Sequence, residues 1–97
     1  MKSKKPKLAK FEVASLLEDD EAIHVFMDDA LETGDAAYIA QALGVVARAK
    51  GMSKVARKSG LSRESLYKAL SADGNPEFST VLKVMDALDL KFSARAG

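Results

Sequence analysis

The chain of 97 residues has no cysteine and no tryptophan, and it has only two prolines and one histidine. The lack of cysteine excludes disulfide bonds, thiolate metal sites and a cysteine nucleophile. No uncharged apolar run approaches the roughly 20 residues of a membrane span. With 47% hydrophobic and 30% charged residues, the composition is that of a folded protein. The length predicts one domain, because a second core of similar size would not fit.

The first ten residues contain five lysines and no acidic residue, and they predict a basic flexible arm. A secretion signal also starts with basic residues, but it continues in an apolar stretch of about 7–15 residues. The apolar stretch here, residues 11–17, contains Glu12 and runs directly into the acidic residues 18–21. No export signal is predicted, and we expect a cytoplasmic protein.

The charges are segregated along the chain, although 15 basic and 14 acidic residues nearly cancel. Residues 1–10 carry +5, residues 11–47 carry −9, residues 48–68 carry +6 and residues 69–97 carry −1. This segregation indicates two surfaces with different partners. The simpler alternative is that each block is the solvated face of its own helices.

Apolar spacing and capping residues predict an all-α fold of five to six helices. Asp19 or Asp20 caps a helix in which apolar residues at helical spacing continue to Thr33. Asp35 caps the next helix, which Gly51 ends. The other segments predicted to be helical are residues 53–59, 63–70 and about 79–88.

The C-terminal segment has a different period, since Leu90, Phe92 and Ala94 alternate with polar residues as in a half-buried β-strand. A lone strand has no partner in an otherwise helical chain. It pairs with the same strand of a second copy, adds to the sheet edge of another protein, or is frayed. We favour self-pairing, which makes these three residues the predicted dimerisation residues.

Residues 52–70 meet the requirements of a helix-turn-helix. Ala56 supplies a small residue where the second helix crosses the first, and Gly60 supplies a turn residue that tolerates a positive φ. Ser62 can cap the second helix. The apolar residues that would lock the two helices together are Val55, Leu61, Leu66, Ala69 and Leu70. With the +6 block on the same segment, the pattern predicts binding of double-stranded DNA; two ordinary packed helices are the alternative.

The second helix of this motif would lie in the major groove, with its N-terminal residues at the base edges. Arg63 can donate two hydrogen bonds to guanine, Glu64 can accept one from cytosine, and Lys68 can reach a base or a phosphate. Phosphate contacts fix the register and carry no sequence information. The candidates for them are Ser53, Ser62 and Tyr67, and either Lys54 or Lys58.

Several segments together resemble a known family. They are residues 17–23, 30–35, 42–52 and 60–70, followed at fixed distance by residues 74–80, which begin Gly-Asn-Pro. The chain resembles the probable addiction-module antidote proteins, the HigA-like antitoxins of bacterial type II toxin–antitoxin operons. The resemblance covers nearly the whole chain after the basic arm. It implies a lambda-repressor-like fold, a dimer that represses its own operon, and a partner toxin of the RelE/ParE-like class.

The resemblance also implies roles for individual positions. Base contacts fall to Arg63, Glu64 and Lys68, and contacts to the DNA backbone fall to Ser62 and Ser71. Two features depart from the family pattern. One is the lysine-rich start, and the other is Asp89, which stands where such proteins usually have glycine before the terminal strand.

The antitoxin interpretation predicts a function for the acidic residues in 11–47, which is to bind the toxin. RelE-like toxins are usually basic because they approach RNA, so an acidic helical surface could cover a cationic active face. The alternative is a solvated helix that only completes the fold. The predicted toxin-binding residues are the apolar anchors Phe11 and Leu16 and the acidic residues Glu18, Asp19, Asp20, Glu21, Asp28, Asp29 and Glu32.

Together these patterns predict a basic arm (residues 1–10) and one helix-turn-helix domain (residues 11–97). Its parts are the acidic helices in 11–51, the helix-turn-helix in 52–71, and the last helix with a dimerising tail in 78–97. The predicted function is that of an antitoxin and autorepressor on a palindromic operator. The alternative is a stand-alone prophage-type transcriptional regulator without a toxin.

No enzymatic activity is expected, because no serine has a neighbouring base or an oxyanion-hole pattern. His24 and Asp28 are spaced as an i,i+4 pair. Two ligands without a third donor make a poor metal site, so neither a metal nor a cofactor is expected.

Overall fold

The computed structural model describes residues 19–97, and its regular structure is entirely α-helical. The helices are α2 (Asp20–Glu32), α3 (Ala36–Lys50), α4 (Met52–Ser59), α5 (Arg63–Ala69) and α6 (Phe78–Ala87). The predicted all-α class is therefore confirmed for this part of the chain. None of the helices in residues 19–97 combines the length and the apolar character needed to cross a membrane.

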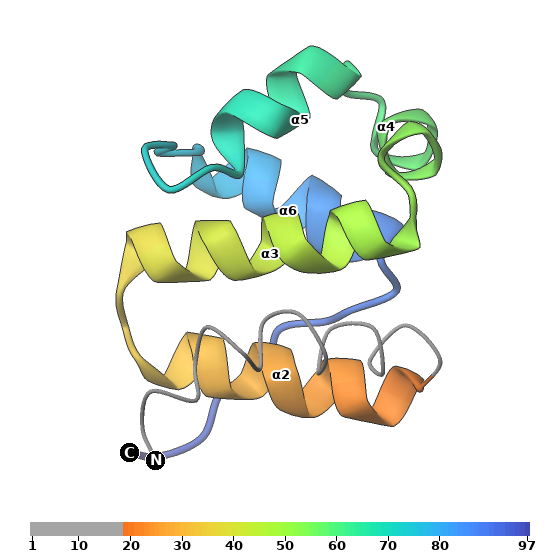
Figure 1. Ribbon diagram of the computed structural model, residues 1–97. Helices are drawn as coiled ribbons and strands as arrows, with labels where there is room; N and C mark the ends of the chain where they lie inside the picture. Colours follow the sequence, from red (N-terminus) through yellow and green to blue (C-terminus); the bar gives the residue numbers. More distant parts are fainter. Residues whose placement is uncertain (1–18) are drawn as a thin grey trace, which may run out of the picture.

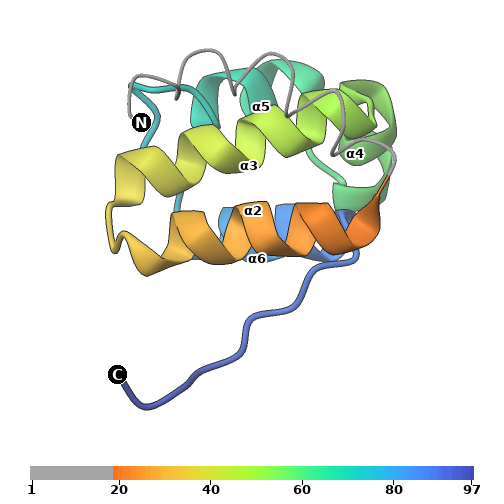
Figure 2. The same cartoon turned by 60° about the horizontal axis from the view of Figure 1, so that its bottom comes forward.

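Helix α3 is the centre of the arrangement. It contacts α2, α4, α5 and α6. Figure 1 shows α2 and α3 running antiparallel, with α4 and α5 on the far side of α3 from α2. Helix α6 packs against both α3 and α4. Beyond α6 the chain continues as an irregular segment without helix or strand (Figure 2).

Helices α2 and α3 begin where the sequence predicts, because aspartate side chains satisfy backbone N–H groups that have no partner inside a helix. Asp19 caps α2 and accepts a hydrogen bond from the Glu21 N–H at 3.0 Å. Asp35 caps α3 and accepts from the N–H groups of Ala37 and Tyr38 at 3.1 and 3.2 Å. Gly51 separates α3 from α4 with a φ of 106°, so this glycine ends α3 as predicted.

One apolar cluster joins all five helices. The predicted core face of α2 is buried at Ile23, Met27 and Ala30, while Phe26 packs against the cluster from its edge. The largest side chains with almost no exposed surface are Leu43, Leu66, Leu70, Val55 and Val84. No buried polar side-chain atom in residues 19–97 lacks a hydrogen-bond partner.

Gly44 allows the end of α5 to approach α3 closely. A Cβ atom at position 44 would collide with the carbonyl oxygen of Leu70 and would lie 3.2 Å from the Leu70 Cβ. Because Leu70 is fully buried, it cannot move aside without opening the core. The contact fixes the position of α5 relative to α3.

The C-terminal segment does not form the predicted strand within residues 19–97. Leu90 is buried in the core of its own chain, and its N–H donates to the Met85 carbonyl at 2.8 Å. Asp89, before it, has a φ of 61° and takes up a left-handed conformation. A strand that pairs only with a second copy has no ladder partner in one chain, so the strand stays a prediction.

Gly44→Ala should destabilise the fold by about 1–3 kcal/mol, because the added methyl group meets the Leu70 backbone. Where a helical glycine has free space around it, replacement by alanine stabilises the protein by about 0.5–1 kcal/mol. The sign of the change in unfolding free energy therefore shows whether the close contact with Leu70 exists. Urea unfolding measures it. Gln41→Ala on the exposed face of the same helix is the control and should stay within about 0.5 kcal/mol of the parent. A Gly44→Ala variant more stable than the parent would contradict the contact.

Candidate nucleic-acid interface

Helices α4 and α5 contact each other and are joined by the short turn at residues 60–62. Gly60 has φ 80° and ψ 10°, the left-handed conformation that the sequence predicts at this position. Its N–H donates to the Ala56 carbonyl at 2.9 Å, so the turn closes the end of α4. Val55 and Leu66 are buried between the helices and the rest of the core, and Leu61 packs at its edge. The pair is therefore held rigidly by its apolar side.

Two serines organise the start of α5. Ser62 caps the helix, since its hydroxyl oxygen accepts the Ser65 N–H at 3.0 Å. The hydroxyl groups of Ser62 and Ser65 also hydrogen-bond to each other at 2.9 Å. The predicted cap is confirmed, and the Ser62 side chain is already engaged at the helix end. Ser65 is exposed on the same first turn and was not among the residues predicted for DNA contact.

The outward face of α5 is polar and exposed. Arg63, Glu64, Tyr67 and Lys68 all lie on it, whereas Leu66 points into the core with no exposed surface. The guanidinium carbon of Arg63 lies 5.8 Å from the centre of the Tyr67 ring, within the range of a cation–π contact. Arg63 is therefore held by a neighbour one helical turn away and presented at the N-terminal end of α5.

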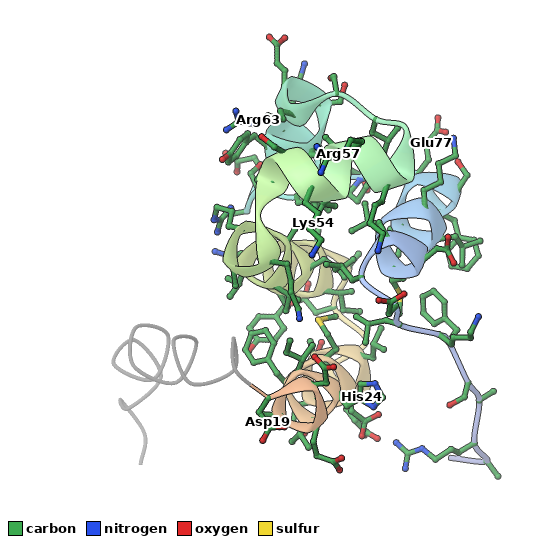
Figure 3. All side chains as sticks on the ribbon, turned by 90° about the vertical axis from the view of Figure 1, so that its right-hand side faces the viewer. Asp19, His24, Lys54, Arg57, Arg63 and Glu77 are labelled. Atoms are coloured by element: carbon green, nitrogen blue, oxygen red, sulfur yellow. The ribbon has the colours of Figure 1, made fainter. Side chains whose placement is uncertain are left out.

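The exposed face of α4 adds positive charge beside α5. Ser53 and Lys54 lie at its first turn, and Lys58 lies further along. Figure 3 shows Arg57 on the outside of α4, between Lys54 and Arg63 in that view. Arg57 was not predicted as a contact residue. Its spacing of three from Lys54, which places both on one helix face, was the signal available in the sequence.

Lys54 and Lys58 also border a small pocket of about 130 Å³ between α4, the start of α2 and the turn after α6. Asp20 and Asp89 line the same pocket. Beside it, Lys50 pairs with Asp20, with 3.3 Å between Nζ and Oδ1. The α4 lysines therefore lie where the basic and acidic parts of the molecule meet.

Ser71 differs from the other predicted DNA-contact residues. It is half-buried after α5, and its hydroxyl donates to the Lys68 carbonyl at 3.0 Å. The exposed polar residues of α4, of the cap of α5 and of α5 itself are Ser53, Lys54, Arg57, Lys58, Ser62, Arg63, Glu64, Ser65, Tyr67 and Lys68. We call this set the α4–α5 face.

The predicted acidic residues lie on and before α2, on the opposite side of α3. The exposed carboxylates there are Asp19, Asp20, Glu21, Asp28, Asp29 and Glu32, and we call this set the α2 face. Arg95 of the C-terminal segment pairs with Glu32 and lies 3.9 Å from Asp28. The basic arm (residues 1–10) and the predicted anchors Phe11, Leu16 and Glu18 lie outside the described residues.

An open groove of about 920 Å³ lies between α2 and the C-terminal segment. Val25, Leu31 and Leu90 contribute apolar surface to it, and Asp28 and Glu32 contribute carboxylates. Among residues 19–97, no three His, Asp or Glu side chains come together in a way that could hold a metal ion. His24 is exposed at the edge of the groove.

The predicted dimerisation residues separate in the structure. Leu90 is buried in its own chain, Phe92 is 40% exposed, and Ala94 is exposed. The ring of Phe92 lies 5.7 Å from that of Phe78 at the start of α6. The three side chains therefore do not form one continuous surface.

The residues matched in the comparisons with known proteins include both the α2 face and the α4–α5 face. A family model described as "probable addiction module antidote protein" matches residues 7–96. A Haemophilus influenzae protein described as uncharacterized is 48% identical over 88 residues, which are 91% of this chain and 91% of that protein. No solved structure matches. Because the family match spans α2 through the C-terminal segment, the chain belongs to the family of probable addiction module antidote proteins.

Proposed function

We propose that the protein is the antitoxin of a type II toxin–antitoxin module, and that it both represses its own operon and neutralises its toxin by direct binding. Membership of an antidote family implies a toxin partner. The observation that carries the proposal is the presence of two exposed faces of opposite charge on either side of α3. One face suits phosphate, and the other suits a cationic protein. In this proposal the protein is a binding protein and not an enzyme.

The α4–α5 face acts as a helix-turn-helix of the lambda-repressor-like kind. Helix α5 enters the major groove, where Arg63 donates to guanine and Glu64 accepts from cytosine. Lys68 reaches a base or a phosphate. Ser53 and Lys54, at the start of α4, bind phosphate oxygens and fix the register. The capped turn and the buried apolar side of the pair support this role, because base reading needs a rigid helix.

Tyr67 has two separable roles in this interface. Its ring lies under the Arg63 guanidinium and limits the orientations that Arg63 can adopt. Its hydroxyl is available to a phosphate, since the side chain is 42% exposed. The ring therefore contributes to base specificity, because it orients Arg63. The hydroxyl contributes to affinity for DNA of any sequence, because it contacts a phosphate.

The operator is a palindrome read by a homodimer, with half-site centres about 34–36 Å apart. A terminal strand in residues 90–95 would then form only when two copies pair. A stand-alone prophage-type regulator would need the same α4–α5 face. The α2 face and the antidote family favour the antitoxin.

The toxin, of the RelE/ParE-like class, binds the α2 face. Helix α2 and its cap contain no Lys or Arg of their own, and although Lys50 pairs with Asp20 and Arg95 with Glu32, carboxylates are in excess on this surface, so it attracts a basic protein over a distance. The adjoining groove supplies apolar surface from Val25 and Leu31, into which a toxin side chain can be buried. Charge would then set the rate of association, and the groove would set the lifetime of the complex.

Arg63→Ala should weaken operator binding by about 1–3 kcal/mol and should remove the preference at one base pair. Fluorescence anisotropy on a panel of single-base operator variants measures both effects. Lys83→Ala removes an exposed basic residue of α6, outside the α4–α5 face, and serves as the control. If Arg63→Ala ranks every operator variant as the parent does, Arg63 does not read a base.

Substitutions of Tyr67 separate its ring from its hydroxyl. Tyr67→Phe keeps the ring under Arg63 and should lower affinity for all operator variants alike. Tyr67→Leu removes the ring and should also weaken the base preference that Arg63 provides, in the same anisotropy panel. Equal base preference in both variants would contradict the positioning role of the ring.

Co-expression with the product of the adjacent gene tests direct neutralisation, and the expected result is growth rescue and a complex that purifies intact. Neutralising three carboxylates (Glu21→Gln, Asp28→Asn and Asp29→Asn) should slow association with the toxin about tenfold or more at low salt. The matched control neutralises Asp73, Glu77 and Asp86, which are exposed outside α2. Growth rescue without a complex would overturn direct neutralisation.

A further inference from the structure

The end of the chain borders the groove that the proposed toxin site uses. Residues 91 and 93–97 line this groove of about 920 Å³ on one side, and residues of α2 line it on the other. Figure 3 shows His24 on the side of α2 that faces the C-terminal segment, and His24 borders the same groove. We call residues 91–97 the strap.

The strap is attached to the molecule near both of its ends. Leu90, directly before it, is buried in the core, and its N–H donates to the Met85 carbonyl at 2.8 Å. Near the other end, Arg95 pairs with Glu32, and its Nη2 lies 3.9 Å from Oδ1 of Asp28. Asp28 and Glu32 are four residues apart on α2, so one guanidinium lies close to both carboxylates. The strap therefore bridges the turn after α6 and the last turns of α2.

We propose that the strap is an autoinhibitory cover of the toxin site. Arg95 occupies Asp28 and Glu32, which a basic side chain of the toxin would otherwise contact, so the toxin binds fully only after Arg95 has left. This role rests on the proposed function, in which the α2 face is the toxin site. Val25 and Leu31, the apolar surface proposed for the toxin, line the same groove as the strap. One closed strap therefore restricts access to both the charged and the apolar part of the site.

The tether explains why this ion pair forms although it is open to water. An exposed pair of separate charges is weak. Arg95 follows the anchored Leu90 by only five residues, so its guanidinium is held near Glu32 at an effective concentration on the order of millimolar. The contact stays reversible, because the Arg95 side chain is 66% exposed and little surface is uncovered when it opens.

Reversible closure makes the strap a filter for basic partners. A partner that binds only the open form loses affinity in proportion to the closed fraction. A basic partner replaces the Arg95 guanidinium at Asp28 and Glu32 with a cation of its own. A neutral or acidic partner would leave both carboxylates unpaired, so the strap disfavours it.

Spin labelling tests whether the strap closes. The chain has no cysteine, so Ala96→Cys gives a single attachment site for a nitroxide at the end of the strap. The label should broaden the amide NMR signals around Glu32, and adding Arg95→Ala should relieve the broadening. Adding Lys91→Ala is the control and should not, because Lys91 pairs with no carboxylate within residues 19–97. No broadening at all, or equal broadening with and without Arg95, overturns the proposal.

A mixed sample distinguishes closure within one chain from contact between two copies. Spin-labelled chains without an isotope label are mixed with isotope-labelled chains that carry no spin label. The α2 signals should stay sharp in this mixture, because the strap closes on its own chain. Broadening would place the C-terminal segment on α2 of another copy and would contradict closure within the chain.

Toxin binding tests the inhibitory role, with the product of the adjacent gene as the probe. Arg95→Ala and removal of residues 93–97 should each strengthen binding about two- to fivefold, the range expected for one exposed ion pair. Lys91→Ala removes the same charge from the same strap and should change the affinity by no more than about 1.5-fold at physiological salt. Surface plasmon resonance measures these affinities. An unchanged affinity in Arg95→Ala, or an equal gain in Lys91→Ala, overturns the inhibitory role.

The two measurements separate failure of the strap from failure of the proposed function. If the product of the adjacent gene does not bind the parent at all, the proposed toxin site fails and the inhibitory role fails with it. The spin label still shows in that case whether the strap closes. If the toxin binds but the strap does not close, the proposed function stands and the autoinhibitory cover is overturned.

Discussion

The structure depends on the close packing of α3 against four other helices. Such a central position requires a helix without a wide polar face, and α3 accordingly buries the small residues Ala40, Ala42, Gly44 and Ala47. Small side chains let neighbouring backbones approach, and at Gly44 the approach is so close that the Leu70 carbonyl occupies the space of a Cβ. Leu43 fills the centre with no exposed surface. The position of α5, and therefore of Arg63, follows from this packing.

The same central helix keeps two charged surfaces apart. Helix α2 lies on one side of α3, and α4 and α5 lie on the other (Figure 1). The near-zero net charge of the chain thus conceals an acidic α2 face and a predominantly basic α4–α5 face. Salt screens exposed charges beyond about 10 Å, so each face presents its own sign to a partner that approaches it. Lys50, at the end of α3, forms an ion pair with Asp20 of the α2 face.

Much of this arrangement could be predicted from the sequence, because its signals are local. Asp19, Asp35 and Ser62 cap helices through their own side chains, and Gly60 takes the positive φ that its place in the turn requires. The role of Gly44 could not be predicted, since its partner Leu70 is distant in sequence. The cation–π contact of Arg63 with Tyr67 was not predicted either, because spacing alone does not specify side-chain orientation.

The C-terminal segment shows why alternation alone is a weak guide to structure. Leu90, Phe92 and Ala94 are equivalent in a two-residue period, yet they have three different environments. The left-handed turn at Asp89 directs Leu90 into the core and satisfies its N–H at the Met85 carbonyl. After that anchor the chain has no sheet edge to follow, and Phe92 finds apolar contact on Phe78 instead. Alternation requires a ladder to impose one environment on all three residues, and a single chain of this protein has none within residues 19–97.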